Sequence, residues 1–217
     1  MQNLELRLEK HIDLLLKRYA ELEVCKNEII ESYLLMEECY KNGGKILVAG
    51  NGGSAADAEH MVGELMKGFV LPRKLDQTYR DKLILTNNEM GAVLADNLQG
   101  ALPAIALDGH FALSTAYMND CEPTLCFAQQ VNGFGNSNDV FVGISTSGNS
   151  KNVMYAATVA RAKGMKVVGL TGSKESKLSA FADVCVKVPN TETYMIQEYH
   201  LPIYHCWCLM IEDHFFG

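Results

Sequence analysis

Four hydroxyl side chains occur within six consecutive residues near the middle of the chain, at Ser145, Thr146, Ser147 and Ser150. The apolar run before them has the pattern of a buried strand, and the segment after them has the pattern of a helix. Free backbone N–H groups at a helix start attract anions, and hydroxyl groups add hydrogen bonds at close range. An ordinary cap with Ser/Thr turns is the alternative, but four hydroxyls exceed what a cap needs. We therefore interpret this segment as a phosphate-binding loop.

A glycine-rich turn makes a second loop of the same kind, with the residues Gly50, Asn51, Gly52, Gly53 and Ser54. It follows the apolar run 46–48, and its glycines let a ligand approach the backbone. We expect Ser54 to cap the next helix in a capping box with Asp57. The turn lacks the spacing of a dinucleotide site and the Gly-Lys-Ser/Thr of a P-loop. A tight turn without a ligand is the alternative, but two such loops in one chain favour anion binding.

Three side chains outside these loops are candidates for chemistry. His60 and Glu64 are four residues apart in a segment with helical spacing, so they share one helix face. His205 lies in the apolar C-terminal segment. Each has a structural alternative, which is a solvated surface pair for the first two and a buried core histidine for His205. Their occurrence in one chain with two anion-binding loops favours the functional interpretation.

Apolar runs alternate with segments of helical spacing along most of the chain. We expect strands at 46–48, 103–107, 140–144, 166–170 and 184–189. We expect helices at 55–68, 89–99, 113–117, 126–132, 151–163 and 193–216, the last with a kink at Pro202. This alternation predicts an α/β fold with a five-stranded parallel sheet flanked by helices. Ligands bind such sheets beyond the carboxyl ends of the strands, where both loops lie.

The N-terminal segment 2–41 has the apolar spacing of two helices, and Asn42-Gly43-Gly44 ends the second one. We expect one domain, with a helical arm (1–42) ahead of an α/β core (43–217). The arm either forms a bundle with another subunit or folds back over its own sheet. The core contains an extended segment at about 70–100, which is longer than a minimal crossover between two strands.

Composition and charge exclude several classes of protein. The net charge of −7 over 217 residues disfavours nonspecific nucleic-acid binding. No run of about eighteen apolar residues occurs, so we expect no membrane span, and the acidic N-terminal region lacks the features of a signal peptide. The seven cysteines are an odd number without framework spacing, so we expect free thiols in a cytoplasmic protein.

Several motifs together resemble the sedoheptulose-7-phosphate isomerases, also called phosphoheptose isomerases, of the sugar isomerase (SIS) domain superfamily. They are Gly50-Asn51-Gly52-Gly53-Ser54, Ala58-x-His60-x-x-x-Glu64, Gly143-Ile144-Ser145-Thr146-Ser147-Gly148-Asn149-Ser150 and Ile196-Gln197-Glu198-x-His200-x-x-x-x-His205. The hydroxyl-rich loop is typical of the superfamily, whereas the histidine, glutamate and glutamine pattern is closer to the isomerases. The resemblance covers nearly the whole chain apart from the 70–100 segment.

The resemblance implies isomerisation of a ketose phosphate to an aldose phosphate through an enediol. It makes Glu64 the base and His205 its partner, and a carboxylate and an imidazole suit these proton transfers. It also implies that the two meet across a subunit boundary in a homotetramer. The expected partner is a small sugar phosphate, and we expect neither nucleic acid nor a membrane.

The resemblance also implies which residues bind the ligands. The substrate contacts would come from Asn51, Gly52, Gly53, Ser54, Glu64, Asn119, Asp120, Ser145, Thr146, Ser147, Ser150 and Gln197. Some members of the family bind zinc, which here would use His60, Glu64, Gln197 and His205. A neutral glutamine amide is a poor zinc ligand, so we expect weaker binding than at a three-histidine site.

The sequence departs from the family pattern in two places. The segment between Phe69 and Pro103 is longer, and Met195 stands where the family usually has arginine, which removes a positive charge near the site. These departures leave three alternatives open: an isomerase of another ketose phosphate, a non-catalytic sugar-phosphate sensor, and a replication-initiator-binding protein. The last class lacks the acid–base residues, so the presence of Glu64 and His205 argues against it.

Overall fold

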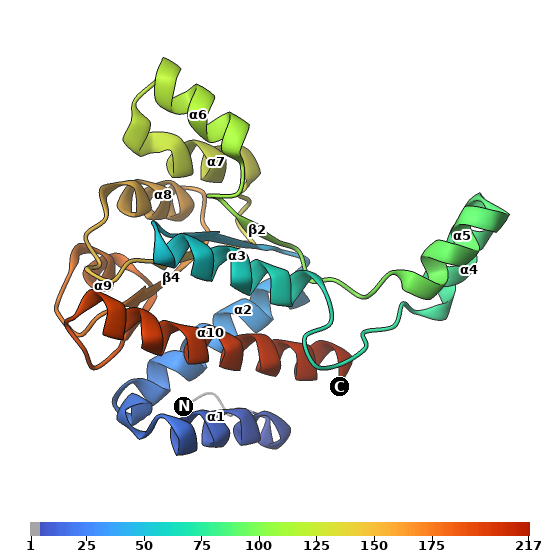
Figure 1. The fold of residues 1–217 in the computed structure, drawn as a ribbon, viewed down its shortest axis with the longest axis horizontal. Helices are drawn as coiled ribbons and strands as arrows, with labels where there is room; N and C mark the ends of the chain where they lie inside the picture. Colours follow the sequence, from blue (N-terminus) through green and yellow to red (C-terminus); the bar gives the residue numbers. More distant parts are fainter. Residues whose placement is uncertain (1–4) are drawn as a thin grey trace.

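The computed structural model describes residues 5–217, and its centre is a five-stranded parallel sheet in the order β2-β1-β3-β4-β5 (Figure 1). The strands are β1 (Ile46–Ala49), β2 (Ala104–Ala106), β3 (Val140–Ile144), β4 (Lys166–Thr171) and β5 (Val184–Lys187). In the central register, Val48 lies opposite Ala106 on one side and Val142 on the other. The predicted sheet is confirmed, and only strand ends differ from the prediction.

Helices cover both faces of the sheet. They are α1 (Leu6–Arg18), α2 (Lys26–Lys41), α3 (Gly53–Met66), α4 (Gln77–Thr86), α5 (Asn88–Asn97), α6 (Phe111–Asp120), α7 (Cys126–Phe134), α8 (Lys151–Ala162), α9 (Lys177–Phe181) and α10 (Thr193–Phe216), with 3₁₀ helices at Ala20–Cys25 and Pro123–Leu125. Helices α2, α3 and α10 pack on one face, and α7, α8 and α9 pack on the other (Figure 1). Among the described helices, none combines the length and the hydropathy that crossing a bilayer requires.

Strand side chains divide between two cores because successive residues of a strand point to opposite faces. Ile46 and Val48 face the core formed with α2, α3 and α10, whereas Leu47 and Ala49 face the core formed with α7, α8 and α9. Burial on both faces is the reason that β1 is an uninterrupted apolar run in the sequence.

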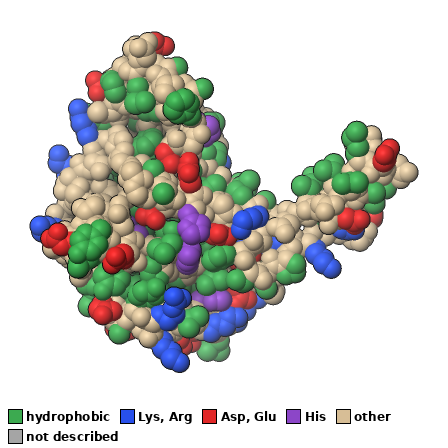
Figure 2. All heavy atoms as spheres, in the orientation of Figure 1, with side chains coloured by type: hydrophobic (Ala, Val, Ile, Leu, Met, Phe, Trp, Pro, Cys, Tyr) green, Lys and Arg blue, Asp and Glu red, His purple; other side chains and the backbone are tan. Residues whose placement is uncertain are grey.

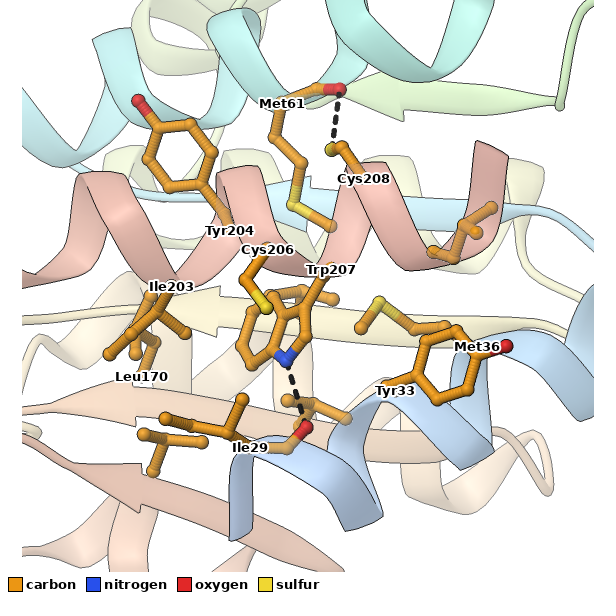
Figure 3. Packing of buried hydrophobic residues seen from close by; sticks show 14 of the residues in the cluster. Ile29, Tyr33, Met36, Met61, Leu170, Ile203, Tyr204, Cys206, Trp207 and Cys208 are labelled. Atoms are coloured by element: carbon orange, nitrogen blue, oxygen red, sulfur yellow. Dashed lines mark hydrogen bonds between the residues drawn. The ribbon is translucent and has the colours of Figure 1, made fainter. Parts of the chain in front are cut away.

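The C-terminal helix α10 lies between α2 and α3, and it carries the largest buried side chain of the core. The indole N–H of Trp207 donates a hydrogen bond to the carbonyl oxygen of Ile29 at 2.9 Å (Figure 3). Cys206 and Cys208 are buried on either side of Trp207, so their role is packing. Pro202 lies inside α10, and the helix continues through it, whereas the expected kink stays a prediction. The packing fixes α10 against α3, and both helices carry candidate site residues.

The N-terminal arm folds back on its own chain. Leu8, Ile12 and Leu15 of α1 are buried in the core that also contains Trp207 of α10. Helix α2 contributes Ile29 to the same core. Of the two arrangements open from the sequence, the structure supports packing on the arm's own subunit. The predicted start of the first helix at residue 2 lies outside the described residues.

The segment between α3 and β2 forms a helical hairpin, α4 and α5, which projects from the body (Figure 1). Asp76 caps α4 and Asn87 caps α5, each accepting a hydrogen bond from a backbone N–H at 2.9 Å. Hydrophobic side chains gather on this hairpin (Figure 2), and Leu85 is 88% exposed. The sequence predicted only the second of these helices. No residue of α4 is buried, so α4 lacks the apolar periodicity that identifies a helix.

Candidate active site

The glycine-rich turn (residues 50–54) joins the carboxyl end of β1 to α3. Gly52 has φ of 59°, a conformation that favours glycine, and α3 begins at Gly53. A Cβ on Gly53 would lie 2.5 Å from Nε2 of Gln197, so the Gln197 amide packs directly over the turn. The predicted capping box is wrong. Ser54 lies inside the helix, is buried and makes no cap hydrogen bond, because Gly52 occupies the N-cap position.

The hydroxyl loop (residues 145–150) joins the carboxyl end of β3 to α8. Ser145 is 3% exposed, and its Oγ lies 2.9 Å from Oγ of Ser150. Oγ of Ser147 accepts a hydrogen bond from the N–H of Asn149 at 3.2 Å. Thr146 and Ser147 line a hollow of about 200 Å³. The four hydroxyls therefore lie around the start of a twelve-residue helix, which is the geometry of an anion site.

The two loops are tied to each other. The amide N–H of Asn51 donates to Oδ1 of Asn152 at 3.0 Å, and the amide of Asn152 donates back to Oδ1 of Asn51 at 2.8 Å. This reciprocal pair connects the glycine-rich turn to the first turn of α8. The sheet thus places both candidate anion-binding loops side by side, because β1 and β3 are neighbouring parallel strands.

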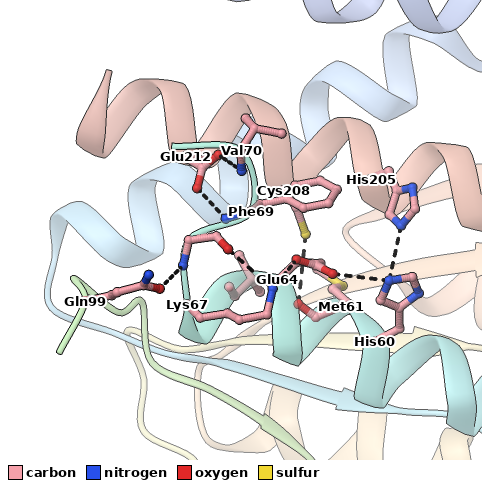
Figure 4. A network of polar contacts seen from close by, with 12 residues as sticks. His60, Met61, Glu64, Lys67, Phe69, Val70, Gln99, His205, Cys208 and Glu212 are labelled. Carbon is pink, nitrogen blue, oxygen red and sulfur yellow. Dashed lines mark hydrogen bonds and ion pairs between the residues drawn. The ribbon is translucent and has the colours of Figure 1, made fainter. Parts of the chain in front are cut away.

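Three of the predicted site residues meet between α3 and α10, and we call them the His60 cluster (His60, Glu64 and His205). The expectation that Glu64 and His205 meet across a subunit boundary is wrong, because His60 of the same chain contacts both of them. Nε2 of His60 lies 3.3 Å from Oε1 of Glu64 and 3.4 Å from Nε2 of His205 (Figure 4). Oε2 of Glu64 also accepts from Nζ of Lys67 at 3.0 Å. Partial burial and then the proximity of His60 lower the pKa of His205, so its imidazole is neutral at neutral pH.

The segment after α3, the connector (residues 67–74), fixes the position of Glu64. The guanidinium of Arg73 donates to the carbonyl oxygens of Glu64 at 2.9 Å and Leu65 at 2.7 Å. Arg73 also forms an ion pair of 2.6 Å with Glu212 of α10, and both side chains are 0% exposed. The carboxylate of Glu212 accepts backbone N–H bonds from the connector as well (Figure 4).

Other predicted site residues lie elsewhere. Gln197 is eight residues before His205 on α10, so it lies about 12 Å along the helix from it and covers Gly53 instead. Asn119 and Asp120 lie at the exposed end of α6, where the Asn119 amide donates to Asp120 at 2.8 Å. Within one chain, the structure brings together the two loops and Gln197 at one place and the His60 cluster at another.

Asp108 is a candidate that the sequence interpretation missed. It follows β2 at the carboxyl edge of the sheet, and its Oδ1 is buried without a hydrogen-bond partner among the described residues. Burial, and to a lesser degree the nearby charge of Glu59, raises the pKa of Asp108 to about 6. The signal was available, because Asp108 comes directly after a predicted strand, where ligand-binding residues of parallel sheets occur.

The arrangement defines a class of protein. Two anion-binding loops at the carboxyl edge of a parallel sheet, with a carboxylate and two imidazoles on flanking helices, suit a phosphorylated small molecule on which protons are moved. The model of the SIS domain family matches residues 10–100 and 94–172 of the chain.

Comparisons with named proteins agree with this class. A phosphoheptose isomerase of Aneurinibacillus thermoaerophilus is 38% identical over 179 residues, which are 82% of this chain and 77% of that one. Phosphoheptose isomerase 2 of Campylobacter jejuni is 34% identical over 224 aligned residues, which cover 100% of this chain and 96% of that one. The structure of the phosphoheptose isomerase of Neisseria gonorrhoeae matches with a TM-score of 0.72 and 33% identity, covering 97% of this chain and 100% of that one. The chain belongs to the phosphoheptose isomerase family of SIS-domain proteins.

Proposed function

We propose that the protein is an isomerase that converts sedoheptulose 7-phosphate to D-glycero-D-manno-heptose 7-phosphate. The observation that carries the proposal is the His60 cluster, in which Glu64 and His205 flank one imidazole in a chain that also has two anion-binding loops. A protein that only binds sugar phosphates needs the loops and has no use for the cluster. The family membership and the names of the relatives support the same reaction.

Each group has a task in this reaction. The hydroxyl loop binds the phosphate, and the glycine-rich turn with Gln197 contacts the sugar chain. The Glu64 carboxylate removes a proton from C1, beside the carbonyl carbon, and the resulting enediolate accepts a proton at C2 to give the aldose. The neutral imidazole of His205 takes the proton of the C1 hydroxyl and returns one to the C2 oxygen. We keep Asn119 and Asp120 as proposed substrate contacts.

We propose that two copies of the chain form each active site. Glu64 comes eleven residues after Gly53 on α3, a rise of about 16 Å, whereas the phosphate loop lies beside Gly53. An extended seven-carbon sugar phosphate is shorter than this from phosphorus to C1. A substrate held by the loops of one copy therefore meets the His60 cluster of another, and we propose a homotetramer as the assembly, following the family resemblance.

We propose that zinc binds at the His60 cluster. Donors bound to one tetrahedral zinc ion at 2.0–2.1 Å lie about 3.3 Å apart, and His60 Nε2 has this separation from both Glu64 and His205. No three His, Cys, Asp or Glu side chains in residues 5–217 form a finished metal site, so the ligands must adjust to bind it. Gln197 of the same chain is too far from the cluster to be a ligand, so a Gln197 ligand would have to come from another copy of the chain. Bound zinc would supply a Lewis acid that polarises the substrate oxygens.

We also propose a cytoplasmic location. All seven cysteines are unpaired in the structure, and six of them are buried or half-buried between helices and strands. Free thiols of this kind persist in a reducing compartment.

A substrate panel tests the proposed function. The purified protein is incubated with sedoheptulose 7-phosphate, with shorter ketose phosphates, and with unphosphorylated sedoheptulose, and products are identified by NMR. We expect turnover of sedoheptulose 7-phosphate alone or by far the fastest. Binding without turnover would indicate a sensor, and faster turnover of a shorter ketose phosphate would assign the site to another isomerase. Neither binding nor turnover would leave the replication-initiator-binding alternative.

A further inference from the structure

The phenol of Tyr204 connects the His60 cluster to a buried carboxyl group. Its hydroxyl lies 2.9 Å from Nδ1 of His60 and 3.3 Å from Oδ1 of Asp57. Tyr204 is 1% exposed, and its ring packs edge-on against His60 with centroids 5.5 Å apart. The hydroxyl therefore has two fixed partners, and both come from α3.

The Tyr204 hydroxyl has one proton, so it can donate a hydrogen bond to only one of these two partners. The burial of the partners indicates which of them accepts it. Oδ2 of Asp57 has no hydrogen-bond partner among the described residues, so Tyr204 is the group that can satisfy this carboxyl. Leaving a buried carboxyl wholly unpaired costs more than leaving a phenol oxygen to accept. Tyr204 therefore donates to Asp57, and its oxygen accepts a hydrogen bond from His60. This requires the proton of the neutral His60 ring to be on Nδ1.

We propose that Tyr204, held by Asp57, is a positioning residue that fixes His60 as the Nδ1–H tautomer. The inference rests on the proposed function only in the role given to the His60 cluster. In this tautomer, the lone pair of Nε2 points to the space between Glu64 and His205. An unprotonated Nε2 then faces both the Glu64 carboxylate and the His205 ring, at 3.3 Å and 3.4 Å, and can accept a proton or bind a cation after small side-chain adjustments. The opposite tautomer would place a hydrogen atom there.

The sequence contains a matched set of variants for a test. Tyr204→Phe removes the hydroxyl and keeps the buried ring. Asp57→Ala removes the acceptor, whereas Asp57→Asn keeps an oxygen that can accept from Tyr204. Tyr40→Phe is the control, because it also removes a buried phenol, whose hydrogen bond goes to Pro103 at 3.3 Å, away from the cluster.

The tautomer is read directly by ¹⁵N NMR of the histidine rings in the full-length, metal-free protein at pH 8, and His60→Gln assigns the signals. We expect a protonated Nδ1 and an unprotonated Nε2 in the wild type, in Asp57→Asn and in Tyr40→Phe. We expect Tyr204→Phe and Asp57→Ala to shift His60 toward the Nε2–H tautomer. An unchanged tautomer in Tyr204→Phe would overturn the proposal, as would an Nε2–H ring in the wild type.

Zinc affinity gives a second readout that needs no turnover. Loss of a group that orients a ligating histidine typically weakens metal binding by about 10–100-fold, and we expect this for Tyr204→Phe in a chelator competition but not for Tyr40→Phe. We expect a fall of similar size in kcat with KM unchanged. If Tyr204→Phe turns over the sugar normally and its His60 tautomer is unchanged, the positioning role of Tyr204 is rejected and the proposed function stands. A wild type that turns over no sugar, but in which Tyr204 sets the tautomer, would reject the proposed function alone.

Discussion

Asp108 shows how burial changes the chemistry of a single carboxyl group. Its Oδ1 is buried without a partner among the described residues, and burial raises its pKa to about 6. The folded protein therefore binds a proton at Asp108 more tightly than the unfolded chain does. The stabilising contribution of this group is complete below pH about 4 and is lost as the pH rises through about 6.

The loss of this stabilising contribution with rising pH predicts how Asp108→Asn changes stability. The amide cannot ionise, so we expect the variant to be more stable than the wild type at pH 7.5, by about 1–2 kcal/mol because solvent screens this half-buried group, with the advantage shrinking as the pH falls to 5. Urea unfolding at both pH values measures the difference. Asp76→Asn is the control, because Asp76 caps an exposed helix and its hydrogen bond survives the change. An advantage that grows toward acidic pH would contradict the assigned pKa.

Residue-scale predictions from sequence succeeded where the contact was local. His60 and Glu64 were placed together by their spacing on one helix, and they lie 3.3 Å apart. The contact between His60 and His205 joins residues 145 positions apart, so no local pattern predicts it, and only the family resemblance grouped the two residues. The predicted capping role of Asp57 was wrong because Gly52 is the N-cap of α3, and the partner that Asp57 has instead, Tyr204 of α10, is one that no local pattern reveals.

At the scale of elements, the connector is held by a buried ion pair. Burial acts to raise the pKa of Glu212, but hydrogen bonds from the connector N–H groups and from Arg73 outweigh it and hold the pKa below the ordinary value. Arg73 in turn binds the last carbonyl groups of α3, including that of Glu64. The pair therefore links the fold of the connector to the position of the proposed base.

Breaking this pair has a predictable cost. Arg73→Met leaves the Glu212 charge buried without its partner, and we expect a loss of about 3–5 kcal/mol in unfolding free energy. Arg161→Met is the control, because the 3.8 Å pair between Arg161 and Asp183 is partly exposed, and we expect a loss of about 1 kcal/mol or less. Denaturant unfolding of both variants measures the two values. Equal losses would mean that the buried pair does not anchor the connector.

Sequence patterns predicted the elements that bury apolar side chains. All five strands were predicted from apolar runs, because the three inner strands are buried between layers of helices and the edge strands β2 and β5 still pack apolar side chains against those layers. Helices α4 and α9 were missed because one buries no residue and the other spans only five. Helix α9 did carry a local signal, a capping box formed by Ser176 and Ser179. Local capping signals thus deserved more weight where apolar periodicity was absent.

At the scale of the whole molecule, the proposed active site needs two copies of the chain. This makes a prediction for mixed assemblies. Ser147→Glu places a negative charge in the hydroxyl loop and Glu64→Gln removes the base, so each variant alone should be inactive. After unfolding and refolding together in equal amounts, about a quarter of the sites should combine an intact loop with an intact base. Recovery of activity to about that level, measured as turnover, is the expected result.

The control for this mixing experiment is the combination of both substitutions in one chain, refolded with the wild type. This mixture separates subunit sharing from simple dilution, because both substitutions are then always in the same chain. No recovery in the first mixture, with both single variants folded and assembled, would show that loop and base act within one chain.

The central claim is that Glu64 transfers a proton at the carbon beside the carbonyl of a bound ketose phosphate. The most direct measurement follows the reaction of sedoheptulose 7-phosphate in deuterated water by NMR and mass spectrometry, with Glu64→Gln and the exposed α2 variant Glu31→Gln in parallel. We expect deuterium at C2 of the aldose product with the wild type and Glu31→Gln. With Glu64→Gln we expect a loss of about 10²–10⁴-fold in rate. Undiminished turnover or deuterium exchange in Glu64→Gln would contradict the account.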